Sequence, residues 1–167
     1  MKTITKTFNI YEFDELNEEI KEKVIKEEEE DIRQFDIDCC LEEEMNNLAE
    51  LLLEENFGEK AILKKVYYSL SYSQGDGVVV EFDLVRGHKE IRVRHNRSRN
   101  YYEFSFDIEE VGEFFLSDNQ LRALKEKIIR INKKLADYGY QYIEEDRTEQ
   151  AIEQLKNCMF YENGEIY

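Results

Sequence analysis

The stretch VYYSLSYSQGDGVVVEFDL, residues 66–84, decides the fold. Apolar and polar side chains alternate on both sides of Gly75-Asp76-Gly77, as they do in two β-strands that each bury one face. Glycines beside an aspartate allow the positive φ angles of a tight hairpin turn. The stretch therefore predicts two antiparallel strands joined by a short turn.

Two later segments continue this pattern. In residues 89–95 an isoleucine and a valine alternate with two arginines, and residues 101–108 repeat the alternation with aromatic side chains. Together the four segments predict an antiparallel meander with one buried face. Alternating residues at positions 4–10 predict one more short strand.

Four other segments place apolar residues three and four positions apart, which is the spacing of an amphipathic helix. They are residues 15–34, 38–56, 118–139 and 148–157. The third follows a capping-box sequence from Ser117 to Gln120 and is expected to end at Gly139. Its spacing also fits a coiled-coil seam, but fewer than three heptads beside an apolar sheet face favour core packing. After the fourth, Asn163-Gly164 predicts the turn of a small C-terminal hairpin.

These elements predict an α+β fold, with a four- to five-stranded antiparallel sheet and three or four helices packed on one face. A length of 167 residues suits one domain, and the chain has no proline and no low-complexity linker that marks a boundary. We therefore expect a single α+β domain over residues 1–167. Apolar runs are too short to span a bilayer, and the first residues lack the apolar stretch of a signal peptide, so we expect a cytoplasmic protein without membrane contact.

The net charge of −16 is concentrated in one region. Residues 12–59 contain 20 acidic and 4 basic residues, whereas residues 60–167 contain 19 acidic and 17 basic residues. The acidic region coincides with a predicted helical pair at about residues 14–57, and its densest runs are Glu27, Glu28, Glu29, Glu30, Asp31, Glu42, Glu43 and Glu44. A basic patch lies in and after the third strand, at Arg92, Arg94, Arg97 and Arg99. The chain is therefore electrically bipolar.

The histidines and cysteines do not form a catalytic or metal-binding pattern. His88 and His95 lack the spacing of a zinc-binding helix. Cys39, Cys40 and Cys158 are odd in number and include no C-x-x-C, so neither a disulfide framework nor a zinc site is indicated. The carboxylates around the first two cysteines oppose thiolate formation.

The Gly-Asp-Gly turn and the many carboxylates do not indicate an enzyme either. The turn, Gly75-Asp76-Gly77, lacks the lysine of a P-loop and the aspartate spacing of a calcium-binding loop. Carboxylate pairs suited to glycosidase chemistry need a defined separation in a cleft, which acidic helix faces rarely provide. We expect no enzymatic activity, no cofactor and no metal.

The two charged regions support different binding hypotheses. Regularly spaced carboxylates on helices can occupy a basic groove that normally binds phosphates, although an acidic face can also be solvated without any partner. The basic patch, with Tyr101 and Tyr102 beside it, can pair with phosphates and stack on bases. The acidic field of the whole chain disfavours direct nucleic-acid binding, and the basic patch can instead pair with the acidic helices in one molecule or in a homodimer.

Four segments resemble a family of small proteins of phages and prophages. They are Phe13-Asp14-Glu15-Leu16, the helix start Glu18-Glu19-Ile20-Lys21-Glu22-Lys23, the hairpin Tyr72-Ser73-Gln74-Gly75-Asp76-Gly77 and the closing Phe160-Tyr161-Glu162-Asn163-Gly164. The aromatic-S-Q-G-D-G hairpin is the specific part of the resemblance. Members of the family are mostly uncharacterised, and the resemblance implies no enzymatic activity.

A small acidic protein that resembles phage proteins is expected to act by binding. The first hypothesis is inhibition of a host defence nuclease, of the anti-CRISPR or antirestriction type, through the carboxylates of the predicted helical pair. The partner is then a Cas or restriction nuclease of the host cell. The alternative is a small regulatory or antitoxin-like module that contacts nucleic acid or a toxin through the basic patch.

Overall fold

The computed structural model describes residues 7–73, 75–87, 89–96, 105–112 and 115–167. Contacts within the chain define two compact units: unit 1 is residues 1–39 with residues 145–167, and unit 2 is residues 40–144. The predicted α+β fold is confirmed, with helices, a four-stranded sheet and a two-stranded sheet, both antiparallel. The single domain expected over residues 1–167 stays a prediction, and each unit is described by itself.

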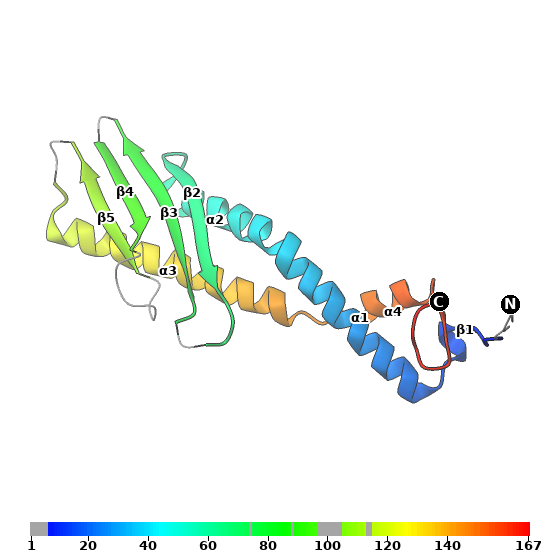
Figure 1. Cartoon of the computed structure of the whole chain (residues 1–167). Coiled ribbons are helices and arrows are strands. Elements are labelled where there is room, and N and C mark those ends of the chain that lie inside the picture. The colour runs from blue at the N-terminus through cyan, green and yellow to red at the C-terminus, as the bar shows by residue number, and fades with distance from the viewer. Residues whose placement is uncertain (1–6, 74, 88, 97–104, 113–114) are drawn as a thin grey trace, which may run out of the picture. The chain divides into compact units, whose positions relative to one another are not determined.

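Unit 2 contains the meander that the sequence predicts. Its strands are β2 (Ala61–Ser69), β3 (Gly77–Arg86), β4 (Lys89–His95) and β5 (Phe106–Val111), and they lie in the order β2-β3-β4-β5 with antiparallel neighbours (Figure 1). The third predicted strand has the expected bounds. The fourth is shifted: β5 begins at Phe106, and residues 101–104 of the prediction lie outside the described residues.

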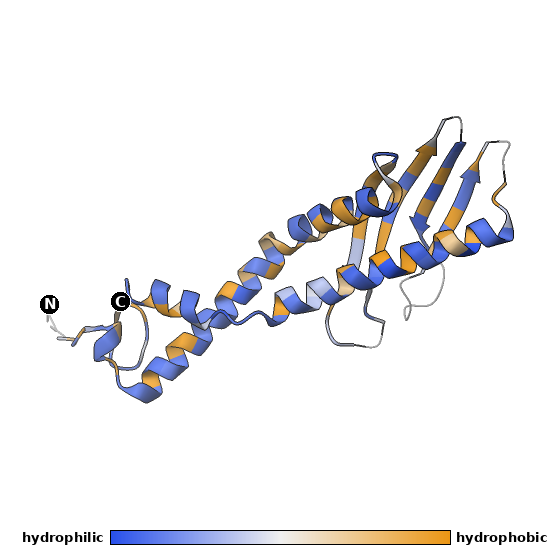
Figure 2. Ribbon diagram, turned by 180° about the vertical axis from the view of Figure 1, so that it is seen from behind, coloured by the Kyte–Doolittle hydropathy of each residue, from blue (hydrophilic) through white to orange (hydrophobic). Residues whose placement is uncertain are grey.

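Two helices, α2 (Leu41–Phe57) and α3 (Asp118–Glu144), cover one face of this sheet (Figure 1). Their apolar residues alternate with polar ones at helical spacing, as the colours of α3 in Figure 2 show. The ring of Phe57 stacks on Phe82 of β3 with centroids 5.4 Å apart. Asn132 of α3 also accepts a hydrogen bond from the Val80 backbone N–H at 3.2 Å, so one polar side chain joins this helix to the sheet inside the core.

The connection between β2 and β3 is longer than the tight turn that the sequence predicts. The first strand ends at Ser69, so the expected strand residues up to Ser73 belong to the loop. The cause is the Asp76 carboxylate, which accepts hydrogen bonds from the hydroxyls of Ser69, Ser71 and Ser73 at 2.9–3.1 Å and from the Ser73 N–H at 3.1 Å. The hydroxyl of Tyr140 on α3 donates a further bond at 2.9 Å, which ties this loop to the helix.

These hydrogen bonds set the ionisation of Asp76. Burial alone would raise the pKa of its carboxyl, but the bonds from Tyr140, the serine hydroxyls and the Ser73 backbone outweigh burial and hold the pKa well below its usual range. Beside it, Tyr72 packs its ring 4.8 Å from that of Tyr140 and donates to Glu144 at 2.5 Å, which raises the pKa of Tyr72 to about 12. The loop is therefore held on α3 by charged and aromatic contacts.

The predicted helix end at Gly139 is wrong, because α3 continues to Glu144. Gly139 is buried, and a Cβ at this position would lie 2.4 Å from Leu70 Cδ1 in the loop. The glycine thus provides room for the loop side chain rather than a stop. The capping box at the other end is confirmed, since Ser117 and Gln120 exchange hydrogen bonds.

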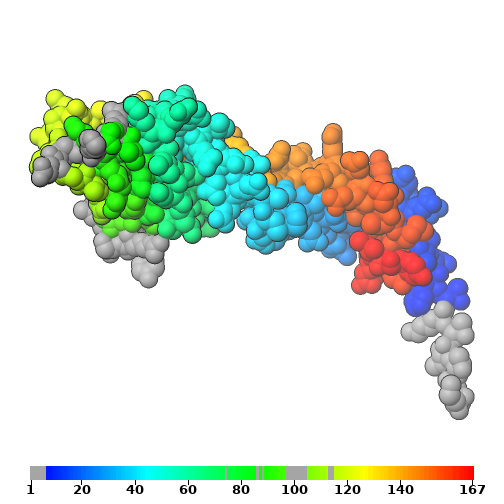
Figure 3. Space-filling view, turned by 90° about the horizontal axis from the view of Figure 1, so that it is seen from above, coloured from blue at the N-terminus to red at the C-terminus, as the bar shows by residue number. Residues whose placement is uncertain are grey.

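Unit 1 is formed by both ends of the chain, which lie side by side in Figure 3 as blue and red segments. Its elements are β1 (Tyr11–Glu12), the 3-10 helix η1 (Phe13–Glu15), α1 (Glu18–Cys39), α4 (Thr148–Leu155) and β6 (Met159–Phe160). The strand predicted at residues 4–10 is wrong for residues 7–10, which are irregular, and its first residues lie outside the described ones. The actual strand, β1, pairs antiparallel with β6. The core residues are Phe13, Leu16, Val24, Leu155 and Phe160.

Polar contacts fix α4 on α1. The guanidinium of Arg147 is buried, and its Nε lies 2.8 Å from Asp36 Oδ2. The adjacent Thr148 hydroxyl donates to Glu29. Because a buried charge is costly without its partner, these contacts specify where α4 packs along α1.

Gly164→Ala should destabilise the chain more than the same replacement at a glycine that has open space around it. Gly164 has φ +87°, and an added Cβ would lie 2.9 Å from both Ile20 and Val24 on α1. We expect the free energy of unfolding to fall by about 1–3 kcal/mol because of backbone strain. Overpacking against α1 should lower it by roughly 1–3 kcal/mol more. Gly58→Ala is the control, since φ is +72° there but nothing lies within 4 Å. Equal losses of unfolding free energy in urea would contradict the close packing of Gly164.

Asp76→Asn should destabilise unit 2 at neutral pH. Because the folded-state pKa of Asp76 is depressed, its contribution is fully present above the unfolded pKa of about 4 and is lost as pH falls toward the folded value. The difference in unfolding free energy between the native chain and the variant should therefore shrink between pH 5 and pH 2.5, as measured by urea unfolding. Asp137→Asn, at an exposed position of α3, should change stability less at pH 7. A difference that stays constant with pH would count against this role of Asp76.

Candidate functional site

The predicted carboxylates of α1 differ in exposure. Glu27, Glu30 and Asp31 are exposed, and their spacing of three and four residues places them on one face of the helix. Glu28 and Glu29 are half-buried, and Glu29 accepts the hydrogen bond from Thr148. Glu29 therefore holds unit 1 together, which its place in a run of glutamates did not reveal.

Nearby cations neutralise only part of the negative charge that the exposed carboxylates of α1 carry. Lys23 Nζ lies 3.7 Å from Glu27 Oε1, and Arg33 lies 2.6 Å from Glu30 Oε2, both within one helical turn. Exposed pairs of this kind contribute about 0–1 kcal/mol, so a stronger partner can replace them. Within the described part of the chain, Asp31 has no ion pair.

The predicted carboxylates of α2 lie in its first turn, where the helix dipole favours negative charge. Glu42, Glu43 and Glu44 are all exposed. Glu44 accepts a hydrogen bond from the Tyr138 hydroxyl at 3.3 Å, whereas Glu42 and Glu43 make no ion pair with any residue that the structure describes. Burial, together with the charge of Glu42, raises the pKa of Tyr68.

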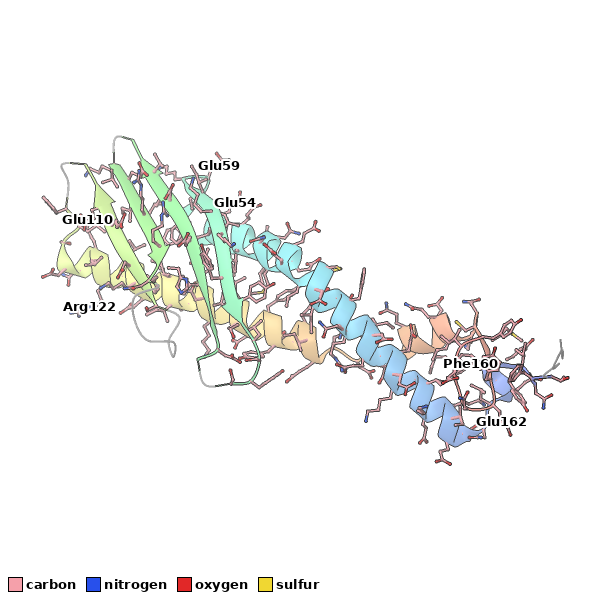
Figure 4. All side chains as sticks on the ribbon, in the orientation of Figure 1. Glu54, Glu59, Glu110, Arg122, Phe160 and Glu162 are labelled. Carbon is pink, nitrogen blue, oxygen red and sulfur yellow. The ribbon has the colours of Figure 1, made fainter. Side chains whose placement is uncertain are left out.

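A second acidic feature of unit 2 was missed by the sequence analysis. A hollow of about 370 Å³ lies at the C-terminal end of α2, and Glu50, Glu54 and Glu59 line it. Its apolar lining includes Leu53 and Ile62, and Figure 4 labels Glu54 and Glu59 beside it. The four-residue spacing of Glu50 and Glu54 was a usable signal, but Glu59 joins them only because the chain turns back into β2.

The two acidic helices belong to different units, so the pair predicted at about residues 14–57 is divided between them. Unit 1 contains 8 basic and 19 acidic residues, a net charge of −11. Unit 2 contains 15 basic and 20 acidic residues, a net charge of −5. Each unit therefore presents its own acidic surface.

The two described arginines of the basic patch, Arg92 and Arg94, are paired within their own sheet. Arg92 Nε lies 2.6 Å from Glu90 Oε1, and the guanidinium of Arg94 binds Asp83 and donates to the Phe82 carbonyl at 3.2 Å. Asp83 is 8% exposed and also lies 3.1 Å from Lys64 Nζ. Burial opposes ionisation of Asp83, but the bonds from Arg94 and Lys64 outweigh it and lower the pKa of that carboxyl.

These pairs show which carboxylates neutralise the described part of the patch. The acids that bind Arg92 and Arg94 come from the sheet and not from the acidic helices. The other two predicted residues, Arg97 and Arg99, lie outside the described residues.

The remaining histidines and cysteines that the structure describes do not gather into a metal-binding group. His95 packs its ring 4.8 Å from that of Tyr67, and His88 lies outside the described residues. Cys39 is exposed, and Cys40 and Cys158 are half-buried. Among the residues that the structure describes, no three His, Cys, Asp or Glu side chains are grouped so that they could hold a metal ion. No helix in the same part of the chain has the length and apolarity that a membrane span requires.

The chain was compared with protein-family models, with curated proteins and with solved structures. None of the three comparisons found a match. The resemblance to small phage and prophage proteins therefore stays a prediction, and function is inferred from the residues and geometry of the two units.

Proposed function

We propose that the chain is a phage-encoded inhibitor of a host defence nuclease, of the anti-CRISPR or antirestriction type. It acts in the host cytoplasm by binding and has no catalytic activity of its own. Exposed carboxylates of α1 and α2 occupy a basic surface through which the nuclease holds nucleic acid. The partner is a Cas or restriction nuclease.

One contrast supports this proposal. The arginines of β4 form ion pairs, whereas several exposed carboxylates of α1 and α2 have no ion pair among the described residues. Arg92 and Arg94 bind carboxylates of their own sheet. Asp31, Glu42 and Glu43 are exposed and have no ion pair among the described residues. The charge left for a partner is therefore negative, which favours a basic protein surface over nucleic acid.

The spacing of the carboxylates suits such a surface. Charges three or four residues apart on a helix recur about every 5 Å along its axis. One strand of a DNA duplex presents a phosphate about every 3.4 Å of axis, so the two spacings are of the same order. Attraction between the acidic helices and a basic groove accelerates association and makes it salt-sensitive.

The alternative function loses support from the pairing of Arg94. To bind a phosphate, this arginine would have to give up its contact with Asp83, and that nearly buried carboxylate would keep Lys64 as its cationic partner. Loss of one of two cationic partners of a buried carboxylate is unfavourable. A regulatory or antitoxin-like module that uses the basic patch is therefore the second hypothesis, and the experiment below includes it as an outcome.

Neutralising the α2 carboxylates should weaken nuclease binding. Glu42→Gln with Glu43→Gln removes two exposed charges that have no ion pair among the described residues. We expect association with the nuclease to slow by about tenfold at low salt, and the difference to shrink at high salt. The measurement is surface plasmon resonance against purified Cas and restriction nucleases, with and without guide RNA, followed by cleavage assays.

The matched control is Glu126→Gln with Asp137→Asn, which removes two exposed charges from α3. Association of this variant should stay within about twofold of the native rate. The proposal fails if no nuclease binds at low salt, or if target DNA does not compete for the bound nuclease. Retention of nucleic acid by the chain, with loss of retention in Arg92→Glu, would instead support the second hypothesis.

A further inference from the structure

Unit 1 has a group of large apolar side chains near its chain ends, here called the aromatic edge: Phe8, Met159, Ile166 and Tyr167, which are exposed, and Tyr161, which is half-buried. The Phe8 and Tyr161 rings meet edge to face at 5.6 Å, and the Tyr161 and Tyr167 rings do so at 5.7 Å. Phe8 is 60% exposed and Tyr167 is 70% exposed. Grouped apolar side chains on a surface mark an interaction site more often than scattered ones do.

The backbone beneath the aromatic edge is held by the core of unit 1. Phe160, fully buried, pairs with Tyr11 of β1 and forms a bridge with Ile166. The Tyr167 N–H donates to the Met159 carbonyl at 2.7 Å, and the turn at Gly164 packs on α1. The members of the aromatic edge within residues 159–167 therefore stand on a hydrogen-bonded support, which lowers the entropy lost on binding.

A hollow of about 550 Å³ lies beside these rings. Phe8 and Tyr161 line its aromatic side, and Glu162 and Glu165 are among its polar lining residues. Figure 4 labels Glu162 on the loop that follows Phe160. Aromatic faces next to carboxylates suit a lysine or arginine side chain, because the rings contact its apolar stem and attract its charge.

We infer that the aromatic edge anchors a basic side chain of a partner protein. The lysine or arginine stem lies in the hollow against Phe8 and Tyr161, and its charged end binds Glu162 or Glu165. The net charge of −11 on unit 1 selects a basic partner over an acidic one. The identity of that partner as a nuclease rests on the proposed function.

The aromatic edge and the exposed carboxylates of the acidic helices have separable kinetic roles. Exposed carboxylates act over several ångströms and mainly set the association rate, whereas buried aromatic contacts mainly set the dissociation rate. Loss of the aromatic edge should therefore shorten the lifetime of the complex without slowing its formation.

The experiment uses the full chain and a nona-arginine peptide as the probe. Phe8→Ala with Tyr167→Ala should weaken peptide binding by about tenfold, chiefly through faster dissociation. Phe35→Ala is the matched control, because Phe35 is also an aromatic residue of unit 1 and is 61% exposed but lies on α1. The affinity of the Phe35→Ala variant for the peptide should stay within about twofold of that of the native chain. Urea unfolding shows whether the variants keep the native fold, and NMR shift changes at Tyr161 and Glu162 should locate the peptide.

The possible results separate this inference from the proposed function. Equal peptide affinity for the native chain and the Phe8/Tyr167 variant, or shift changes confined to α1, would overturn the aromatic anchor while nuclease binding remained. Peptide binding at the aromatic edge in a chain that binds no nuclease would support the anchor and overturn the nuclease as partner.

Discussion

The pairing of Arg94 and Lys64 with Asp83 determines how charge is distributed in unit 2. Asp83 lies in the middle of β3 and is nearly buried, so its carboxylate must have cationic partners to stay ionised. Arg94 of β4 and Lys64 of β2 meet this need at close range. Once they are engaged, α2 retains exposed carboxylates that have no ion pair among the described residues, and these are what the proposed partner would contact.

Unit 1 uses its buried arginine in a similar way. Arg147 lies against Asp36 inside the unit, and the neighbouring Thr148 binds Glu29. These contacts remove Glu29 from the acidic surface, although Glu27 and Asp31 beside it remain exposed. In both units, therefore, cations and hydroxyls near the core hold the fold, while unpaired carboxylates lie outside. Solubility alone explains an acidic surface equally well, but it does not explain why large aromatic side chains are exposed beside one.

Local periodicity predicted the elements well where neighbours in sequence decide the structure. The strand at residues 89–95 has its predicted bounds because alternating side chains fix which face is buried. The sequence predicts a helix end at Gly139 because glycine often ends helices, whereas its role in the fold depends on Leu70, a residue 69 positions away. The predicted strand before the hairpin is too long for the same reason, since Tyr140 and three serines converge on Asp76 only in the folded chain. At the site, exposure of the acidic runs was predictable, but the role of Glu29 and the hollow at Glu59 depend on contacts between distant segments.

Charge and apolar contact contribute differently to binding, so an acidic surface alone would be an incomplete inhibitor under the proposed function. Carboxylates on a solvated helix attract any cationic protein, and salt weakens that attraction. Specific and lasting occupation of a nucleic-acid groove needs contacts that exclude water, which large aromatic side chains provide at low entropic cost. Unit 1 contains both: α1 presents Glu27, Glu30 and Asp31, and the aromatic edge lies next to the pairing of β1 with β6. In the proposed complex, the carboxylates would bring a basic surface close, and the rings would then hold one of its side chains.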